Sequence, residues 1–247
     1  MLASQRKTHL LELLARDGRI VAKSAATELE VSEDSIRRDL RELADAGACI
    51  RVYGGALPVP PADRPVAERL NLATASKERV ARAAAERIRP GSTVVIDGGT
   101  TALLLAGLLP AGADLTVITP SPAVALRVAE TTDARVILLG GELTRHSLVA
   151  GGPLAIEAAA RLSADAFFLG VTGVHPEHGL TTGDLDDAVT KRVLAGRSAD
   201  VYVLASEEKI GAVSRYPVLA LDAVAELITD PHDTNPLLPA LTARTRP

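Results

Sequence analysis

The stretch VIDGGTTALLLAGLL, residues 95–109, decides the fold class. An apolar run ends at an acid, turns on two glycines and two threonines, and continues as a Leu/Ala-rich segment. This is the pattern of a β-strand that leads through a glycine-rich turn into a helix. Free backbone N–H groups at such a turn, together with the helix dipole, favour a bound anion. We therefore expect an α/β domain with an anion-binding loop at this position.

The alternation of strands and helices continues on both sides of this stretch. Short apolar segments rich in β-branched residues are expected as strands at 93–97, 115–119, 135–139, 166–171, 201–205 and 226–229. Alanine-rich helical segments lie between most of them, at 77–88, 102–109, 123–130, 154–162 and 186–195. Such an alternation predicts a mostly parallel sheet that helices cover on both faces.

Composition excludes several classes of protein. The chain has one cysteine, Cys49, which excludes an internal disulfide framework and a multi-cysteine metal site. Its longest apolar run, 102–109, is far shorter than the ~20 residues of a membrane span. The N-terminus has no signal-peptide layout, so we expect a cytoplasmic protein. The net charge of −4 means that any DNA binding must depend on where individual arginines lie.

A proline-rich segment, LPVPPADRPVAERL at 57–70, divides the chain. Its prolines disfavour both helix interiors and sheet ladders, so we interpret it as a stiff linker. The predicted organisation is a DNA-binding domain at 1–57, a linker at 58–70, an α/β effector-binding domain at 71–232 and a loose C-terminal tail at 233–247.

The first 57 residues contain three helical patterns followed by a hairpin pattern. We expect Ser24 to cap a short second helix and Ser32 to cap the third, which Gly47 ends. Residues 49–56 are expected to form a small β-wing, with Cys49 as a small apolar residue beneath it. Helices in this order, followed by a wing, predict a winged helix-turn-helix, whose second motif helix enters the major groove of DNA.

The apolar stripe of the third helix, Ile36, Leu40 and Leu43, places Arg38 and Arg41 on the opposite face. Arginine binds guanine edges and phosphates, so this face is a candidate DNA-binding surface. The same arginines could instead pair with acids four residues away on a solvated helix. The candidate DNA contacts are Ser24, Ser32, Ser35, Arg37, Arg38, Arg41, Arg51 and Tyr53.

The stretch VSEDSIRRDLRELADAGACIRVYGGA, residues 31–56, closely resembles the N-terminal domain of DeoR-type transcriptional regulators. Their recognition helix and wing usually run T-I-R-R-D-L-x-x-L followed by G-x-x-x-R-x-x-G-G-A. Here Ser35 stands where threonine is usual, and Cys49 and Tyr53 stand where leucine and histidine are frequent. The resemblance implies a regulator that binds a double-stranded DNA operator.

From Lys77 to Asp230 the chain resembles the C-terminal domain of the same family, which has a fold like ribose-phosphate isomerases and CoA-transferases. That domain binds phosphorylated sugars or related metabolites. DGGTT (97–101) is similar to the family's D-S-G-T-T loop. Other segments follow in the family's order: LLGGEL (138–143), FFLGVTGV (167–174), GLTTGDLDDAVTK (179–191) and LITD (227–230).

Candidate effector-binding residues lie near the predicted carboxyl edge of the sheet, where open α/β folds bind ligands. They are Asp97, Gly98, Gly99, Thr100, Thr101, Thr119, Ser121, Gly140, Gly141, Gly170, Thr172, Gly173, Thr181, Asp184, Lys191 and Lys209. Two segments depart from the family pattern. Pro120 replaces an asparagine, and Ser206-Glu207-Glu208 replaces Asp-Ser-Ser, which changes the charge and the hydroxyl-binding groups near the expected ligand.

We therefore expect a repressor of carbohydrate-metabolism genes, without catalysis or a cofactor, that responds to a small phosphorylated sugar or related metabolite. A homo-dimer or homo-tetramer would place paired winged helices on repeated half-sites. No membrane partner is expected.

Two alternatives stay open at this point. One is a sugar-phosphate isomerase or transferase with an appended helical domain, which would need an acid and a base from Asp97, Asp184, Asp186 and Asp187. The other is a regulator that has lost its effector. We expect no metal site, because His175 and His178 lie in a Gly/Pro loop without an evident third ligand.

Overall fold

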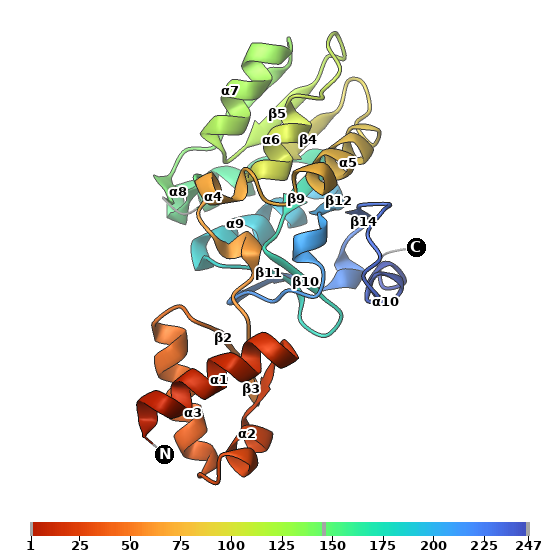
Figure 1. Cartoon of the computed structure of the whole chain (residues 1–247). Coiled ribbons are helices and arrows are strands. Elements are labelled where there is room, and N and C mark those ends of the chain that lie inside the picture. Colours follow the sequence, from red (N-terminus) through yellow and green to blue (C-terminus); the bar gives the residue numbers. More distant parts are fainter. Residues whose placement is uncertain (1, 145–146, 246–247) are drawn as a thin grey trace.

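The computed structural model describes residues 2–144 and 147–245, which form a small helical domain and a larger α/β domain (Figure 1). The chain passes from the first to the second through the proline-rich segment. Within the described residues, none of the helices combines the length and the apolar character needed to cross a bilayer.

The N-terminal domain is a winged helix-turn-helix, as predicted. Its helices are α1 (Ala3–Asp17), α2 (Ala22–Glu28) and α3 (Glu33–Asp45), and its three-stranded sheet has the order β1 (Ile20–Val21), β3 (Gly55–Leu57) and β2 (Ile50–Val52). Leu10, Ile36 and Leu40 are almost fully buried between the helices, and Cys49 is buried with them. The Ser32 side chain accepts the Ser35 N–H at 3.2 Å, so this predicted cap is confirmed.

The cap predicted at Ser24 is wrong. Helix α2 begins three residues earlier than a cap at Ser24 would place it, because its N-cap is Val21, and Ser24 is an exposed residue of its first turn. Strand pairing sets this start: Val21 pairs with Gly55 in the sheet, and the Ala22 N–H donates to the Gly54 carbonyl at 2.8 Å. The sheet therefore positions the backbone that a serine cap would otherwise have fixed.

The second domain is built on a six-stranded parallel sheet. Its order is β14 (Glu226–Thr229), β12 (Ser198–Ala205), β9 (Ala164–Gly170), β4 (Thr93–Ile96), β5 (Thr116–Thr119) and β6 (Arg135–Leu138). All six are the strands expected from the sequence, with ends that differ by a few residues. The strands could be predicted because a parallel sheet is covered on both faces, so that its strands appear in the sequence as short, β-branched apolar runs.

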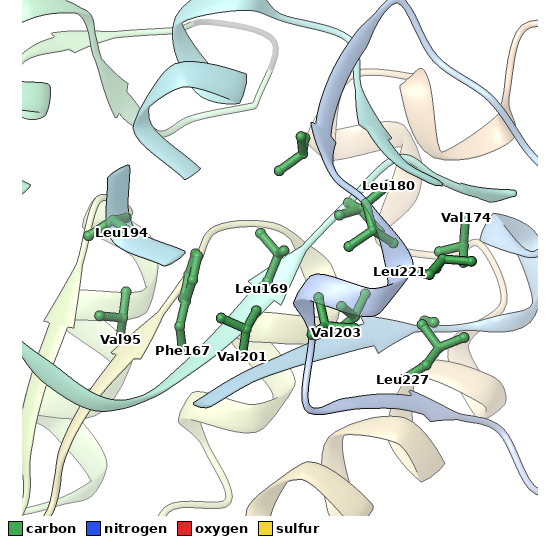
Figure 2. Packing of buried hydrophobic residues seen from close by; sticks show 14 of the residues in the cluster. Val95, Phe167, Leu169, Val174, Leu180, Leu194, Val201, Val203, Leu221 and Leu227 are labelled. Carbon is green, nitrogen blue, oxygen red and sulfur yellow. The ribbon is translucent and has the colours of Figure 1, made fainter. Parts of the chain in front are cut away.

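Helices cover both faces of the sheet (Figure 1). They are α5 (Thr74–Ala85), α6 (Thr100–Ala106), α7 (Pro122–Thr131), α8 (Gly152–Ala160) and α9 (Leu185–Gly196). Alternate strand residues point to opposite faces. Phe168 packs in the cluster that includes α5, α6 and α7, whereas Phe167 packs in the cluster that includes α8 and α9. Figure 2 shows Phe167 beside Val95, Val201 and Leu169 in the second cluster.

A smaller antiparallel sheet was not expected from the sequence. It consists of β10 (Gly173–His175), β11 (Gly179–Thr182) and β13 (Tyr216–Leu219), and a separate two-stranded ladder joins β7 (Glu142–Leu143) to β8 (Ala150–Gly151). These strands are short and contain glycines, so their sequences resemble turns. Their position matters because β11 leads into α9, which carries part of the site described below.

The linker and the tail also depart from the prediction. The linker contains a 3₁₀ turn η1 (Pro61–Asp63) and a short helix α4 (Val66–Arg69), which Pro65 precedes as its N-cap. Proline is compatible with a helix start because its φ is already helical and its missing N–H has no intrahelical partner there. The tail is docked: helix α10 (Leu238–Thr242) buries Leu241 completely in the core of the second domain.

Candidate DNA-binding surface and effector pocket

The exposed face of α3 carries Arg38 and Arg41, as the helical periodicity predicted. Both side chains are exposed, and within the described residues neither makes a hydrogen bond or an ion pair within 4.0 Å. The alternative in which Arg38 pairs with Glu42 is not realised within 4.0 Å, and Glu42 instead accepts Lys7 Nζ from α1 at 2.8 Å. This contact lowers the pKa of Glu42. The two arginines are therefore available to a partner outside the domain.

Three further candidate DNA contacts, Arg37, Arg51 and Tyr53, lie around one groove of the N-terminal domain. Arg37 donates from Nη2 to Glu33 at 2.6 Å, and the two line a groove between α3 and the wing. Arg51 and Tyr53 border the same groove, and Tyr53 is fully exposed at the wing tip. The groove lies between the two elements that a winged helix places on DNA.

Ser32 and Ser35, at the start of α3, already form hydrogen bonds with one another. Ser32 caps the helix, and its Oγ lies 2.9 Å from the Ser35 Oγ. Ser24 lies on α2, away from the groove that Arg51 lines. A DNA phosphate at the N-terminus of α3 would meet Ser32 and Ser35 as a preformed pair of hydroxyls.

A pocket lies at the carboxyl edge of the parallel sheet, as expected. Many of the candidate effector residues line it: Gly98, Gly99, Thr100, Thr101, Gly170, Thr172, Asp184, Lys191 and Lys209. Further residues enter that were not among the candidate effector residues. Thr182, Gly183, Asp187 and Glu208 come from segments that the sequence had singled out for a ligand, whereas Ala62, Asp63, Arg69, Ser147 and Val149 come from segments that it had not. Its free volume is about 50 Å³.

The floor of the pocket is a buried ion cluster around Lys191. Its Nζ lies 2.7 Å from Asp97 Oδ2 and 2.7 Å from Asp187 Oδ1. Backbone N–H groups of Gly98 and Gly170 also donate to Asp97, at 2.8 and 2.9 Å. Burial alone would lower the pKa of Lys191, but the two carboxylates raise it overall. Lys191 is therefore a permanently charged cation that two acids already neutralise, and Asp97 lies behind the pocket wall.

Two other cations reach the pocket, and within the described residues neither makes an ion pair with a carboxylate. Lys209 is buried, and its Nζ donates to the Leu204 carbonyl at 2.7 Å. Burial lowers the pKa of Lys209 to about 8. Arg69 extends from α4, and burial lowers the pKa of its guanidinium as well. A bound anion would offset the energetic cost of burying both positive charges.

Four buried polar atoms without a hydrogen-bond partner gather at this pocket. They are Arg69 Nε, Thr101 Oγ1, Ser147 Oγ and Glu208 Oε2. Only one further atom of this kind, Asp233 Oδ2, occurs elsewhere in the described part of the chain. Buried polar groups in native proteins almost always have a partner, so a cluster of unpartnered ones indicates a place where a polar ligand or water binds.

Several candidate effector residues do not line the pocket and have local structural roles instead. Thr119 Oγ1 accepts the Ser121 N–H at 3.1 Å, and Ser121 in turn caps α7. Gly141 has a φ of +146°, and a Cβ there would lie 2.5 Å from the Gly151 carbonyl oxygen. Gly140 adjoins it in the same loop. These four residues therefore shape the loops after β5 and β6.

Gly173 and Thr181 likewise serve the small antiparallel sheet. A Cβ at Gly173 would lie 2.3 Å from the Ala212 carbonyl oxygen. Thr181 Oγ1 accepts the Ser214 N–H at 2.8 Å. Asp184 lines the pocket and also caps α9, because its side chain accepts the Asp187 N–H at 2.8 Å.

The two segments that depart from the family pattern behave differently. Pro120 does not line the pocket, and its carbonyl accepts the Ala150 N–H at 2.8 Å. Of the two glutamates, Glu207 is exposed, whereas the Glu208 side chain is buried at the pocket. Ser206 Oγ donates to Glu208 at 2.9 Å, and Lys77 Nζ lies 3.7 Å from the same carboxylate. Lys77 thus offsets the negative charge that Glu208 brings to the site.

The segment His175-Pro-Glu-His178 has a third potential metal ligand after all. Ligand atoms of His175, Glu177 and His178 lie within 4.8 Å of one another at the turn between β10 and β11. The expectation that no third ligand is nearby is therefore wrong. His175 Nδ1 accepts the Glu177 N–H at 3.1 Å, which leaves Nε2 as the ring nitrogen available to a metal.

Comparison with known proteins follows the same division of the chain. Residues 6–59 match the DeoR-like helix-turn-helix domain, and residues 72–231 match the DeoR C terminal sensor domain. The HTH-type transcriptional regulator GlpR of Haloferax volcanii is 35% identical over 93% of this chain and 91% of its own length. The HTH-type transcriptional repressor GlcR of Bacillus subtilis is 33% identical over 93% of this chain and 89% of its own length. The glycerol-3-phosphate regulon repressor of Escherichia coli is 31% identical over 93% and 92%.

Similarity to solved structures is partial. Ribose 5-phosphate isomerase A of Methanocaldococcus jannaschii aligns with a TM-score of 0.40 and 17% identity, over 54% of this chain and 53% of its own. The eIF2B β subunit of Chaetomium thermophilum aligns with a TM-score of 0.47 and 15% identity, over 69% and 53%. These alignments are too distant to indicate a function. The two domain matches and the relatives, by contrast, cover almost the whole chain. This protein belongs to the DeoR family of helix-turn-helix transcriptional regulators.

Proposed function

We propose that this regulator is a repressor of carbohydrate-metabolism genes and that its sensor pocket binds a small phosphorylated sugar or polyol. The names of the relatives support the first part, because one is a repressor of the glycerol-3-phosphate regulon and another is a transcriptional repressor. The second part depends on the chemistry of the pocket in this chain.

The cluster of unpartnered polar atoms is the observation that carries this proposal. Arg69 Nε can donate, Thr101 Oγ1 and Ser147 Oγ can both donate and accept, and Glu208 Oε2 can accept. A phosphorylated sugar offers both kinds of partner: phosphate oxygens that accept and hydroxyls that donate. Arg69 and Lys209 supply the positive charge that a phosphate needs. Helix α6 has only seven residues, so we assign the anion affinity to these side chains and not to its dipole.

No catalytic step is included in this proposal. The enzyme alternative needs a carboxylate that is free to take a proton from the substrate. Of the four acids considered, Asp97 and Asp187 are both ion-paired with Lys191, Asp184 caps α9, and Asp186 does not line the pocket. We expect that ribose 5-phosphate is not isomerised when it is incubated with the protein. The cytoplasmic location and the homo-dimeric or tetrameric state inferred from the sequence stay part of the proposal.

Calorimetric titration of the full chain tests the pocket. The ligands are glycerol 3-phosphate, fructose 1-phosphate, glucose 6-phosphate and ribose 5-phosphate, each beside its unphosphorylated counterpart. We expect at least one phosphate to bind about tenfold or more tightly than its counterpart, which corresponds to about 1.4 kcal/mol. Binding of no phosphate, or equal binding of both forms, would contradict the proposal. In parallel, a binding measurement with DNA from upstream of the chain's own gene tests whether the protein recognises an operator there.

A further inference from the structure

The roof of the effector pocket comes from the linker. Ala62, Asp63 and Arg69 line the pocket, although they belong to the segment that joins the two domains. In Figure 1 this segment runs from the wing through α4 and lies against the second domain before it enters α5. We call residues 62–70 the strap. A ligand in the pocket would touch the sensor domain and the strap at the same time.

The strap is fixed to the sensor domain near both of its ends. At the first end, Ser214 Oγ donates to Asp63 Oδ2 at 3.0 Å. Asp63 also packs against Gly183, where a Cβ would lie only 2.0 Å from its Oδ1. At the other end, Lys77 Nζ donates to the Arg69 carbonyl at 2.8 Å, and the Lys77 side chain is 2% exposed. These contacts hold the backbone on either side of the Arg69 side chain.

Arg69 points toward the glycine-rich loop in which a phosphate was expected from the sequence. Gly99 has a φ of +100°, and its absent Cβ would lie 3.7 Å from Arg69 Nη1. Arg69 Nε and Thr101 Oγ1 are two of the unpartnered buried atoms, and both line the pocket. A planar guanidinium can donate two parallel hydrogen bonds to a phosphate. The strap therefore presents the kind of group that the loop needs as a partner.

The free volume of the pocket is about 50 Å³, whereas pockets for small molecules usually measure about 300–1,000 Å³. A sugar phosphate can enter only if part of the lining moves. Part of the lining, such as Thr100, Lys191 and Leu204, belongs to helices and strands that are packed in the core. Helix α4, by contrast, has only four residues, and none of them is fully buried, so its movement exposes less apolar surface than movement of a core helix would.

We propose that the strap is part of the effector site: Arg69 binds the anionic group of the effector, and the effector displaces the segment that carries the DNA-binding domain. This inference rests on the proposed function, because it assumes that the pocket binds a sugar phosphate. Its consequence is that no relay through the sensor domain is required. Part of the binding energy acts directly on the connection between the domains, so the ligand distinguishes two positions of the strap.

Substitutions on the strap test the role of Arg69. Arg69→Met removes the charge at similar length, Arg69→Lys keeps a charge without the fork, and Arg64→Met is the control because Arg64 is exposed on the same strap. Calorimetry with the four sugar phosphates should show at least tenfold weaker binding for R69M, intermediate binding for R69K and binding within twofold of the parent for R64M. R69M within twofold of the parent would overturn the proposal. Cooperative urea unfolding checks that each variant is folded.

Proteolysis of the unaltered protein tests the displacement without any substitution. A glutamate-specific protease can cut after Glu68 on the strap and after Glu30 in the turn between α2 and α3, and both residues are exposed. The phosphate that binds most tightly should change the cleavage rate after Glu68 severalfold and leave the rate after Glu30 unchanged. Equal rates after Glu68 with and without ligand would contradict the proposed displacement.

The two proposals fail in different ways. If the unaltered protein binds none of the four phosphates, the proposed sugar-phosphate function fails. If it binds one of them, while R69M binds equally well and cleavage after Glu68 is unchanged, only the role of the strap fails.

Discussion

The cations of the recognition helix and the cations of the sensor pocket have opposite surroundings. Arg38 and Arg41 are exposed and, within the described residues, have no hydrogen-bonding or ion-pairing partner. Lys77, Lys191 and Lys209 are each less than a tenth exposed, and each donates to a carbonyl or a carboxylate. Exposed charges cost the fold little and stay available to a large partner. Buried charges are held in one geometry, which suits a small ligand.

This difference predicts different effects of mutation. A surface ion pair contributes about 0–1 kcal/mol to stability, whereas removal of one partner from a buried pair costs about 3–5 kcal/mol. Substitutions on the recognition helix should therefore change DNA binding and leave folding intact. Substitutions in the pocket should change the free energy of unfolding even in the absence of a ligand.

Lys191→Met should give the largest effect. The substitution leaves Asp97 and Asp187 buried without their shared cation, so we expect the free energy of unfolding to fall by about 3–5 kcal/mol. Urea denaturation followed by circular dichroism measures this loss. Arg192→Met, at the next and exposed residue of α9, is the control, since it removes a charge and a hydrogen bond to the Pro217 carbonyl but no buried ion pair. A loss below about 1 kcal/mol in K191M would mean that the cluster is solvated and that our account of the pocket floor is wrong.

The double substitution Arg38→Ala and Arg41→Ala should give the next largest effect. We expect DNA binding to weaken by about 2 kcal/mol or more, because a bidentate arginine contact to a base contributes about 1–3 kcal/mol. The free energy of unfolding should change by less than about 0.5 kcal/mol. Fluorescence anisotropy with upstream DNA measures the affinity, and Arg161→Ala in the sensor domain is the exposed control. Unchanged DNA affinity would remove α3 from the DNA interface.

Lys209→Met should stabilise the protein when no ligand is bound. Burial lowers the pKa of Lys209 to about 8 in the folded chain, so the unfolded state binds the proton more tightly. Removal of the charge should raise the free energy of unfolding at pH 7 by about 1–3 kcal/mol, after allowance for the lost hydrogen bond to Leu204.

The stability difference between K209M and the parent should depend on pH in a defined direction. Between pH 8 and the ordinary lysine pKa, the unfolded state holds more protons than the folded state, so the parent gains stability as the pH rises. The advantage of K209M should therefore shrink from pH 8 to pH 10.5 and be absent above it. Urea titrations at pH 7, 9 and 10.5 follow this change, with the exposed Lys23→Met as the control. A difference that does not vary with pH would contradict a buried Lys209.

Ser32→Ala should give the smallest effect. It removes the side chain that accepts the Ser35 N–H, and loss of such a cap costs about 1 kcal/mol. Hydrogen exchange at the first turn of α3 should report this loss locally. Ser24→Ala, whose side chain caps no helix in the structure, should leave exchange unchanged. Equal effects of the two substitutions would show that the cap of α3 is not at Ser32.

Most of the fold could be predicted from the sequence because its signals are local. The six strands of the parallel sheet are apolar runs bounded by turns, and the stripe of Ile36, Leu40 and Leu43 fixes the orientation of α3. Ser24 was misinterpreted because pairing between Val21 and Gly55, which are far apart in the chain, sets the start of α2. The tail was misinterpreted because burial of Leu241 depends on the core of another segment.

The pocket was predicted only in part for a similar reason. Glycines after strands mark turns, and only the fold separates those that approach a ligand, such as Gly98, from those that approach backbone, such as Gly141. Arg69 was missed because the prolines around it indicate a linker. The signal that could have identified it is the short VAER pattern after Pro65, which allows a helix and places an arginine at its end.

If the sugar-phosphate pocket is coupled to DNA binding, the protein must bind its effector with different affinities in the presence and in the absence of operator DNA. Calorimetry should be performed on the free protein and on the protein saturated with upstream DNA, with the phosphate that binds most tightly. Coupling between sites is reciprocal and typically amounts to about 5–150-fold. We expect the effector affinity to change at least about fivefold, by the same factor as the change in DNA affinity that the effector causes. The same effector affinity in both states, from a protein that binds both partners, would contradict this coupling.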